Sequence, residues 1–291
     1  MNGFMIRYYF LKKIINKLPE VIKKELEYTD DTLFDLATFL STPYFYKLLS
    51  KFRKDKYKIY QRFDIDNLEK LLLESIILLS KVHDYKKLLL VYSMEAYISF
   101  DKYIIPYINT FKDEKTSLTE ALLDLDYYYT LKYDNIDLSK TRISDIFKTK
   151  FIYQKYMDDL IHKPFVKVYS FFLSEEYMKK SYKNKNKFLR HHTKKKKGIK
   201  LLLTKLNDKL FYNKLPITLH ELSYNDFVDT KILNLEKNTY SFDGKDIKLD
   251  FDEFIEKIIN ITYERIYAIN EYLFYKKSDK LLKLYNTDIK L

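Results

Sequence analysis

The sequence predicts an all-α fold, a single multi-helix domain over residues 1–291 with one small β-hairpin near residues 239–249. Apolar residues recur every three or four positions along most of the chain, which is the spacing of one buried helix face. The 291 residues include 3 Gly and 5 Pro, too few for Gly-rich phosphate loops or folds built from many tight turns. With 46% hydrophobic residues the chain can bury a real core, which excludes a disordered protein.

Start signals mark the helices of the first half of the chain. The apolar residues of Tyr8–Lys17 fall on one helix face, and Pro19 suits the first turn of the next helix. Asp30–Asp31 and either Asp64 or Asp66 precede further apolar periodic segments, where an aspartate acts as an N-cap.

The second half shows similar signals. Thr116 or Ser117 is an expected N-cap, Pro164 is expected to split two helices, and Asp250 is expected to cap a long helix. The predicted helices cover Tyr8–Lys17, Pro19–Tyr28, Asp30–Phe39, Tyr44–Phe52, Asp64–Lys81, His83–Pro106, Ser117–Tyr133, Ser139–Ile161, Lys163–Tyr182, Ile199–Tyr212, Asp250–Tyr275 and Ser278–Tyr285.

The segment Thr239–Leu249 has a different pattern. It places Asp243-Gly244 between short runs of alternating apolar residues, which is typical of a two-residue hairpin turn. An ordered loop is the alternative.

The positive charge is concentrated in residues 179–200. Eleven basic residues and no acidic residue lie there, and they account for nearly all of the formal net charge of +12. They are Lys179, Lys180, Lys183, Lys185, Lys187, Arg190, Lys194, Lys195, Lys196, Lys197 and Lys200. Such a segment fits the phosphates of a nucleic acid or of anionic lipid headgroups, and the anion-binding residues that we predict are Arg190, Lys194, Lys195, Lys196 and Lys197. A solvated basic loop between helices is the alternative.

Composition also limits the chemistry and the compartment. The chain contains no Cys, so disulfides, thiol catalysis and Cys-based zinc sites are excluded, and a reducing cytoplasm is the expected location. The N-terminus has no long apolar stretch and predicts no signal peptide, and runs such as Leu88–Tyr92 are far shorter than the roughly 20 residues of a membrane span. The five His show no metal-binding spacing, and the carboxylate pair Asp124/Asp126 is expected to face solvent.

Four segments, collinear along most of the chain, resemble the motifs of the bacterial zinc-dependent phospholipase C-like family. Val91–Ile108 (VYSMEAYISFDKYIIPYI) is similar to the central motif G-Y-x-x-H-Y-x-x-D-x-x-x-H-P-Y-I, and Ile6–Pro19 (IRYYFLKKIINKLP) to T-H-x-x-F-G-x-x-V-L-x-x-L-P. Thr42–Tyr46 resembles the turn G-P-D-x-F-F-Y, and Lys231–Tyr240 (KILNLEKNTY) resembles D-x-L-N-L-E-H-x-x-W.

The resemblance implies helices around a zinc cluster that activates water against a phosphodiester or phospholipid, and most of the expected ligands are missing. The matched ligand positions hold Arg7, Thr42, Tyr97, Asp101, Ile105 and Lys237, so that Asp101 is the one metal-binding residue type that remains among them. Because zinc needs about four ligands, or three and a water, we expect no metal or other cofactor here.

The leading hypothesis is therefore a catalytically inactive phospholipase C-like protein with a binding or regulatory role, towards a phosphate-bearing ligand. A charge cluster of Arg7, Asp101 and Lys237 in place of the metal would support it, and scattered positions of these residues would contradict the resemblance. The alternative is a helical protein that binds nucleic acid or an anionic membrane surface through residues 179–200. A third hypothesis, an active hydrolase with a metal bound elsewhere, lacks identifiable ligands.

Overall fold

The computed structural model describes residues 3–41, 64–81, 85–138, 140–148, 162–170, 175–191 and 230–277, together with positions 279, 281, 283 and 285. Within these residues the protein is mostly helical and has one two-stranded antiparallel sheet, so the predicted all-α fold is confirmed. No described helix combines the length and the apolar character that crossing a bilayer requires.

Helices make up the first part of the chain. They are α1 (Phe4–Lys17), α2 (Glu20–Leu26), α3 (Asp30–Ala37), α4 (Ile65–Leu79), α5 (Tyr85–Ser99), the π-helix η3 (Phe100–Ile104), α6 (Ile105–Phe111) and α7 (Leu118–Asp134). The remaining elements are α8 (Ile143–Ile146), α10 (His162–Tyr169), α11 (Glu175–His191), the 3₁₀ helix η5 (Thr230–Leu233), β1 (Tyr240–Phe242), β2 (Lys245–Ile247) and α13 (Phe251–Tyr275).

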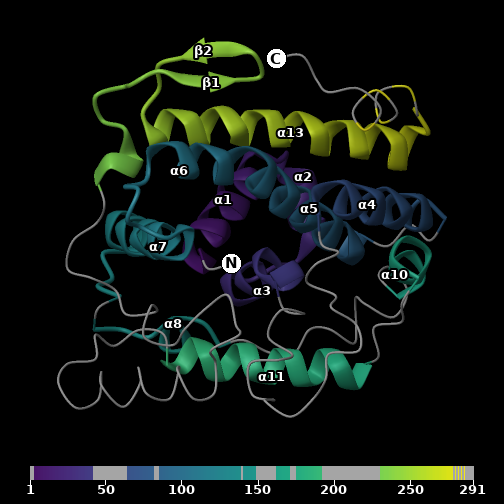
Figure 1. Cartoon of the computed structure of the whole chain (residues 1–291). Coiled ribbons are helices and arrows are strands. Elements are labelled where there is room, and N and C mark those ends of the chain that lie inside the picture. The colour runs from purple at the N-terminus through teal and green to yellow at the C-terminus, as the bar shows by residue number, and fades with distance from the viewer. Residues whose placement is uncertain are drawn as a thin grey trace.

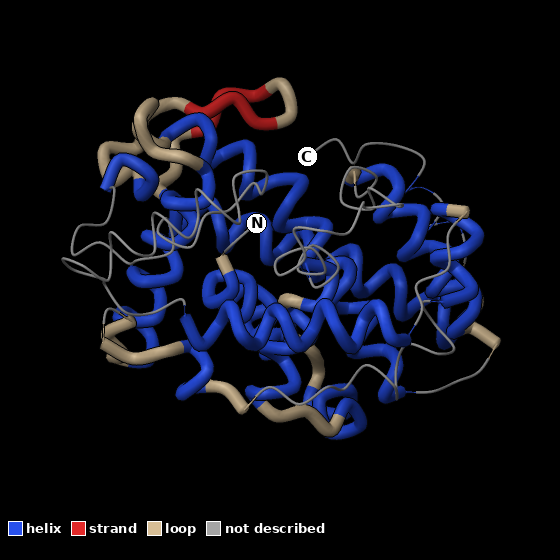
Figure 2. The backbone as a smooth tube through the Cα atoms, turned by 60° about the horizontal axis from the view of Figure 1, so that its bottom comes forward, coloured by secondary structure: helices blue, strands red, loops and turns tan. Residues whose placement is uncertain are grey.

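Helix α1 lies at the centre of the molecule, surrounded by α3, α5, α7 and α13 (Figure 1). Nearly all of its side chains from Phe4 to Leu11 are buried, which a helix exposed on one side could not achieve. Helix α13 covers one side of the bundle with the hairpin beyond it, and α8 and α11 lie at the opposite edge (Figure 1). The tube view shows the hairpin projecting from a body of helices (Figure 2).

Several predicted caps are confirmed. The side chain of Asp64 accepts the backbone N–H of Asn67 at 2.8 Å, and Ser117 and Asp250 each open a reciprocal capping box. The third helix is an exception, because Thr29 rather than an aspartate accepts the N–H of Thr32.

Three predicted helix boundaries are wrong. Helical backbone continues past Pro106 to Phe111, because the wide π-turn of η3 precedes the proline and leaves it near the N-terminus of α6, where no N–H is needed. The predicted Lys163–Tyr182 helix has Pro164 in its first turn as α10, but it ends at Tyr169, before Ser170 with its φ of 52°, and α11 begins at Glu175. The predicted Ser139–Ile161 helix is interrupted at Phe147, whose extended backbone lets its ring stack on Phe34 at 4.3 Å between centroids.

The predicted helices Tyr44–Phe52 and Ile199–Tyr212 lie outside the described residues.

The hairpin prediction is confirmed. Tyr240 pairs with Ile247 and Phe242 with Lys245, and Asp243 and Gly244 both have positive φ as the tight turn requires. The hairpin packs on α6 and α13 through aromatic contacts such as Tyr240 with Tyr107, 5.0 Å between centroids.

The buried side chain of Asn234 fixes the base of the hairpin. Its amide donates to the carbonyl oxygens of Asn238 and Leu249 at 3.0 and 2.9 Å, and its oxygen accepts the N–H of Asn238 at 2.9 Å. The phenol of Tyr107 donates to the same Leu249 carbonyl at 3.0 Å. One asparagine therefore satisfies the backbone at both ends of the hairpin.

Replacing Asn234 with Ala should lower the free energy of unfolding by about 1–3 kcal/mol, because buried backbone groups lose their partner. Chemical denaturation followed by circular dichroism measures this. Asn238→Ala is the matched control, since its backbone rather than its side chain makes these bonds. Equal destabilisation of the two variants would contradict the role assigned to the Asn234 side chain.

Candidate functional site

The buried Arg7 forms an ion pair with Asp101, whose side chain is 25% exposed. Arg7 lies on α1 with 6% of its surface exposed, and its Nη2 donates to Oδ1 of Asp101, 94 residues along the chain, at 2.5 Å. Both positions were matched to metal ligands from the sequence. The fold therefore brings two of the predicted site residues together as a charge pair.

Aromatic rings enclose the guanidinium of Arg7. Its Cζ lies 4.2 Å from the ring centroid of Tyr97 and 4.3 Å from that of Phe100. A guanidinium over ring faces is stabilised by the ring quadrupole, most strongly where water is excluded. Burial by itself lowers the pKa of Arg7, but the charge of Asp101 outweighs it and raises the pKa overall. Burial raises the pKa of Tyr97, so its phenol is neutral.

The π-helix η3 directs side chains of neighbouring residues to different partners. Asp101 reaches Arg7, whereas the Nζ of Lys102 donates to Oε1 of Glu69 on α4 at 3.2 Å. The wider turn inserts one residue relative to an α-helix, which re-aims the side chains around it. Such turns are frequent at functional sites, and this one carries the central segment of the family resemblance.

Asp126 is a buried carboxylate that the sequence analysis placed in solvent. It is fully buried, and its neighbour Asp124 is nearly so, which makes that expectation wrong. Its Oδ1 accepts the backbone N–H of Ile6 at 2.8 Å, and Phe4 and Met5 also donate backbone hydrogen bonds to it. The physical reason is that Gly3, which precedes α1, offers no side chain to cap the helix, so α7 supplies the carboxylate.

Two atoms at this centre keep hydrogen-bonding capacity. Nη1 of Arg7 and Oδ2 of Asp126 are buried and have no hydrogen-bond partner among the described residues. The two charges nevertheless attract each other, since each shifts the pKa of the other. Oδ2 of Asp126 can therefore still bind one hydrogen-bond donor, and Nη1 of Arg7 can still bind one acceptor.

A second buried charge cluster lies on the other side of η3. Nε of Arg265 on α13 donates to Oε1 of Glu95 on α5, and its Nη2 lies 3.4 Å from Oε1 of Glu69. Tyr285 donates to the other Glu95 oxygen at 2.8 Å and places its ring 4.9 Å from the guanidinium. Sequence analysis missed this cluster, because residues so far apart in the chain give no spacing signal.

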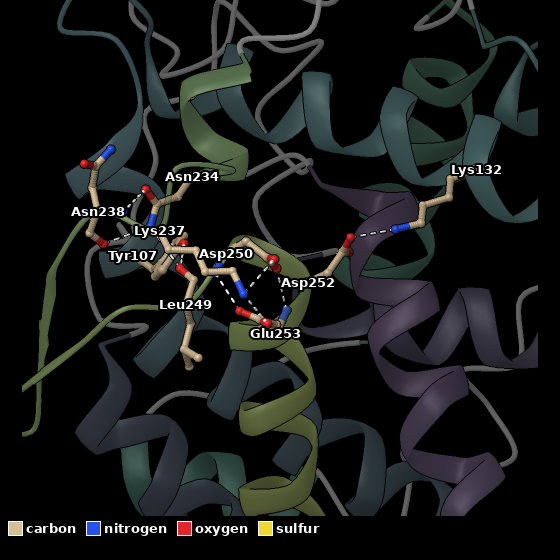
Figure 3. A network of polar contacts seen from close by, with 9 residues as sticks. All are labelled: Tyr107, Lys132, Asn234, Lys237, Asn238, Leu249, Asp250, Asp252 and Glu253. Carbon is tan, nitrogen blue, oxygen red and sulfur yellow. Dashed lines mark hydrogen bonds and ion pairs between the residues drawn. The ribbon is translucent and has the colours of Figure 1, made fainter.

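Lys237 does not join the central pair. Its Nζ lies 2.5 Å from Glu253 and 3.9 Å from Asp250, beside the capping box of α13 (Figure 3). The convergence that would support the resemblance therefore holds for Arg7 and Asp101 and fails for Lys237. Lys237 has a φ of 52° and lies in the turn before the hairpin, close to the acidic residues at the N-terminus of α13. Ile105 is half-buried against the core, and Thr42 lies outside the described residues.

The first half of the basic segment is helix rather than loop. Residues 179–191 belong to α11, whose buried face includes Met178, Ser181 and Leu189 and whose exposed face includes Lys179 and Lys183. Arg190 lies in this helix, but its side chain is outside the described set, as are Lys194, Lys195, Lys196 and Lys197 entirely.

Lys185 departs from the predicted phosphate-binding role. It is fully buried, its Nζ donates to Oγ1 of Thr38 at 3.0 Å, and it lies 3.8 Å from Asp35. Burial lowers its pKa to about 8, although Asp35 opposes the shift. Tyr182 donates to both oxygens of the same Asp35, so Lys185 helps to anchor α11 on α3 instead of facing an anion.

The residues at the central pair do not fit a zinc ion. The part of the chain that the structure describes contains no group of three His, Cys, Asp or Glu able to hold a metal. Asp101 already neutralises Arg7, and the guanidinium stands where its charge opposes a dication.

Comparisons with known proteins give no relative. No protein-family model, curated protein or solved structure matches this chain. Its function is therefore argued from the residues and their geometry.

Asp126 should make the stability of the protein fall as the pH rises towards neutral. Burial raises its pKa to about 7, although the N–H groups of Ile6, Phe4 and Met5 and the charge of Arg7 oppose this. The unfolded carboxyl titrates near 3.9, so between about pH 4 and 7 the folded state binds the extra proton. This group should therefore lower the unfolding free energy by up to about 1.4 kcal/mol per pH unit.

Denaturation of the wild type and of Asp126→Asn between pH 4.5 and 8 tests this expectation. The asparagine keeps an acceptor for the N–H of Ile6 but does not titrate. The unfolding free energy of the variant should therefore increase relative to that of the wild type as the pH rises. Parallel pH profiles would contradict the raised pKa.

Proposed function

We propose that this chain is a catalytically inactive relative of the zinc-dependent phospholipase C-like proteins, with a binding or regulatory role. The observation that carries the proposal is the ion pair of the buried Arg7 with the partly buried Asp101, with Tyr97 against the guanidinium. These residues occupy three positions that the resemblance matches to metal ligands, and they come from two segments far apart in sequence.

The pair supplies a physical reason for the loss of the metal. A partly buried carboxylate that loses its cation keeps an uncompensated charge, so another positive group in that place stabilises the scaffold. Arg7 supplies that charge and several hydrogen-bond donors, of which an N–H of Nη2 reaches Asp101. In this proposal the scaffold is kept and the water-activating centre is lost.

The charges limit where a phosphate-bearing ligand can bind. Arg7 faces the carboxyl groups of Asp101 and Asp126. Lys237 faces those of Glu253 and Asp250. The positive charge of each of these two basic residues is therefore already compensated. A phosphate at the central pair would meet two carboxylates. We therefore assign the phosphate contact of this proposal to the basic residues of 179–200 other than the buried Lys185, in a cytoplasmic protein.

Zinc content tests the proposal. Protein purified without chelator or a histidine tag, and again after zinc addition and dialysis, should retain no zinc in elemental analysis. Arg7→His combined with Tyr97→His places two imidazoles beside Asp101 and should create zinc retention. Zinc bound stoichiometrically by the wild type would contradict the proposal.

Arg7→His combined with Lys237→His is the matched control. It adds the same number of histidines, but one of them lies at the hairpin base beside Glu253. It should retain less zinc than the first double variant. If circular dichroism shows both variants folded and their zinc content is the same, the assignment of these positions to a former metal site is wrong.

A second candidate function is binding of polyanions through α11. The observation that favours it is that the helix buries its apolar face in the protein and exposes Lys179 and Lys183 on the outside. A helix whose apolar face is occupied cannot insert into a bilayer, so contact with lipid headgroups or nucleic acid would be electrostatic.

Lys179→Glu combined with Lys183→Glu should weaken binding of a labelled DNA duplex in fluorescence anisotropy. The slope of log K against log salt should flatten by about 0.9 for each phosphate that the variant no longer neutralises. Lys231→Glu with Lys245→Glu makes the same charge change near the hairpin, at the opposite edge (Figure 1). Equal effects of the two pairs would show a response to net charge and contradict a site on α11. Anionic vesicles in the same assay distinguish a lipid surface from nucleic acid.

A further inference from the structure

Four tyrosines form a cluster where α1, α7 and α13 meet. Tyr9 comes from α1, and Tyr128, Tyr129 and Tyr133 come from α7. Ring centroids lie 5.4 Å apart for Tyr9 with Tyr133 and for Tyr128 with Tyr129, and 5.5 Å apart for Tyr129 with Tyr133. We refer to these four residues as the tyrosine cluster.

Three rings of the cluster lie beside an ammonium group of the protein itself. Nζ of Lys132 lies 5.4, 6.0 and 5.7 Å from the ring centroids of Tyr128, Tyr129 and Tyr133. The same Nζ donates to Oδ2 of Asp252 at 2.6 Å, and the phenol of Tyr129 donates to Oδ1 at 2.5 Å (Lys132 and Asp252 are shown in Figure 3). Three rings and a positioned carboxylate thus bind one ammonium.

A second ammonium uses the same aromatic surface. Nζ of Lys13 on α1 lies 5.2 Å from the ring centroid of Tyr133 and 3.3 Å from Glu256 on α13. Partial burial lowers the pKa of Lys132, but the hydrogen bond and charge of Asp252 outweigh it and raise the pKa overall. The cluster stabilises positive charge twice, with contributions from three helices.

We infer that the tyrosine cluster is a binding site for a primary ammonium, namely a lysine side chain of a partner protein, which enters by displacing Lys132 from Asp252. The resident lysine marks the site and shows the contacts that a guest ammonium would make. The half-exposed ring of Tyr133, 42% accessible, is the approach to it.

Displacement is feasible because the resident pair is near the surface. Lys132 and Asp252 are 39% and 41% exposed, and exposed ion pairs contribute little to stability. Lys132 can then move into water at low cost, while the rings and Asp252 remain in place, since Tyr129 is buried and bonded to that carboxylate.

The acceptor chemistry selects a primary ammonium. Asp252 accepts an N–H bond from Lys132, and a quaternary ammonium has no N–H to give. Arginine is larger and presents its donors in a plane, so it cannot reproduce a point-charge ammonium among three rings. Lys13 and Lys17 both pair with Glu256, so removing Lys132 leaves Asp252 as the carboxylate of the site without a lysine partner.

Titration of the full chain with N-acetyl-lysine methylamide, followed by ligand-observed NMR, tests the inference. The norleucine analogue, which lacks the amine, should not bind, and tetramethylammonium should bind more weakly than the lysine probe. Lys132→Ala should bind the lysine probe about tenfold more tightly, because the internal competitor is gone. No gain in this variant would overturn the inference.

Substitutions at Tyr133 separate a cation–π contact from apolar packing. Tyr133→Phe keeps the ring and should bind as the parent does, whereas Tyr133→Leu keeps an apolar side chain without the ring and should lose binding severalfold. Both are best made in the Lys132→Ala background, and the exposure of Tyr133 lets both fold. Equal affinities of the Phe and Leu variants would overturn the inference.

Lys231→Ala is the matched control for the lysine substitution. Lys231 donates to Asp113 at the same 2.6 Å as Lys132 to Asp252, at another exposed position. Its removal frees a carboxylate that does not belong to the tyrosine cluster. If this variant gains affinity for the probe as Lys132→Ala does, the probe binds any freed carboxylate and the assignment to the cluster is wrong.

Discussion

The ion pair between Arg7 and Asp101 is the interaction around which the rest of the structure is arranged. A guanidinium buried on the central helix is tolerated only with a partner at hydrogen-bond distance, and removing one partner of such a pair typically costs about 3–5 kcal/mol. The pair therefore fixes α1 against the end of α5. The π-turn follows from the same need, because it directs Asp101 inward while Lys102 turns towards Glu69.

Charged contacts of the same kind join the other elements. Asp126 of α7 caps the start of α1, Arg265 of α13 binds Glu95 of α5, and Lys185 of α11 reaches α3. A core of interchangeable aliphatic residues would permit several helix arrangements, whereas a buried charge is satisfied in one register. We infer that in this Lys- and Tyr-rich chain these pairs specify the arrangement of helices.

The distribution of compensated charge connects the fold to the proposed roles. Inside, Arg7 and Arg265 are neutralised by carboxylates, which favours a scaffold role for the centre over binding of a phosphate or a metal. At the surface, α11 exposes lysines, and the tyrosine cluster holds lysine ammonium groups over aromatic rings. The binding functions that the geometry favours therefore lie on the outside of an interior whose arginines are already paired.

The sequence by itself determined most of the described helices, several of their caps and the hairpin, because these depend on residues within a few positions of one another. Asp64, Ser117 and Asp250 cap their helices as local chemistry requires, and Asp243-Gly244 makes the turn. It also indicated Arg7 and Asp101 as site positions, through the resemblance. The tertiary structure decided what surrounds them. Asp126 became a buried cap rather than a solvated residue, Lys185 an anchor rather than a phosphate ligand, and Lys237 part of the hairpin base. Burial and charge compensation depend on segments up to about two hundred residues apart, and no local pattern encodes which of them will meet.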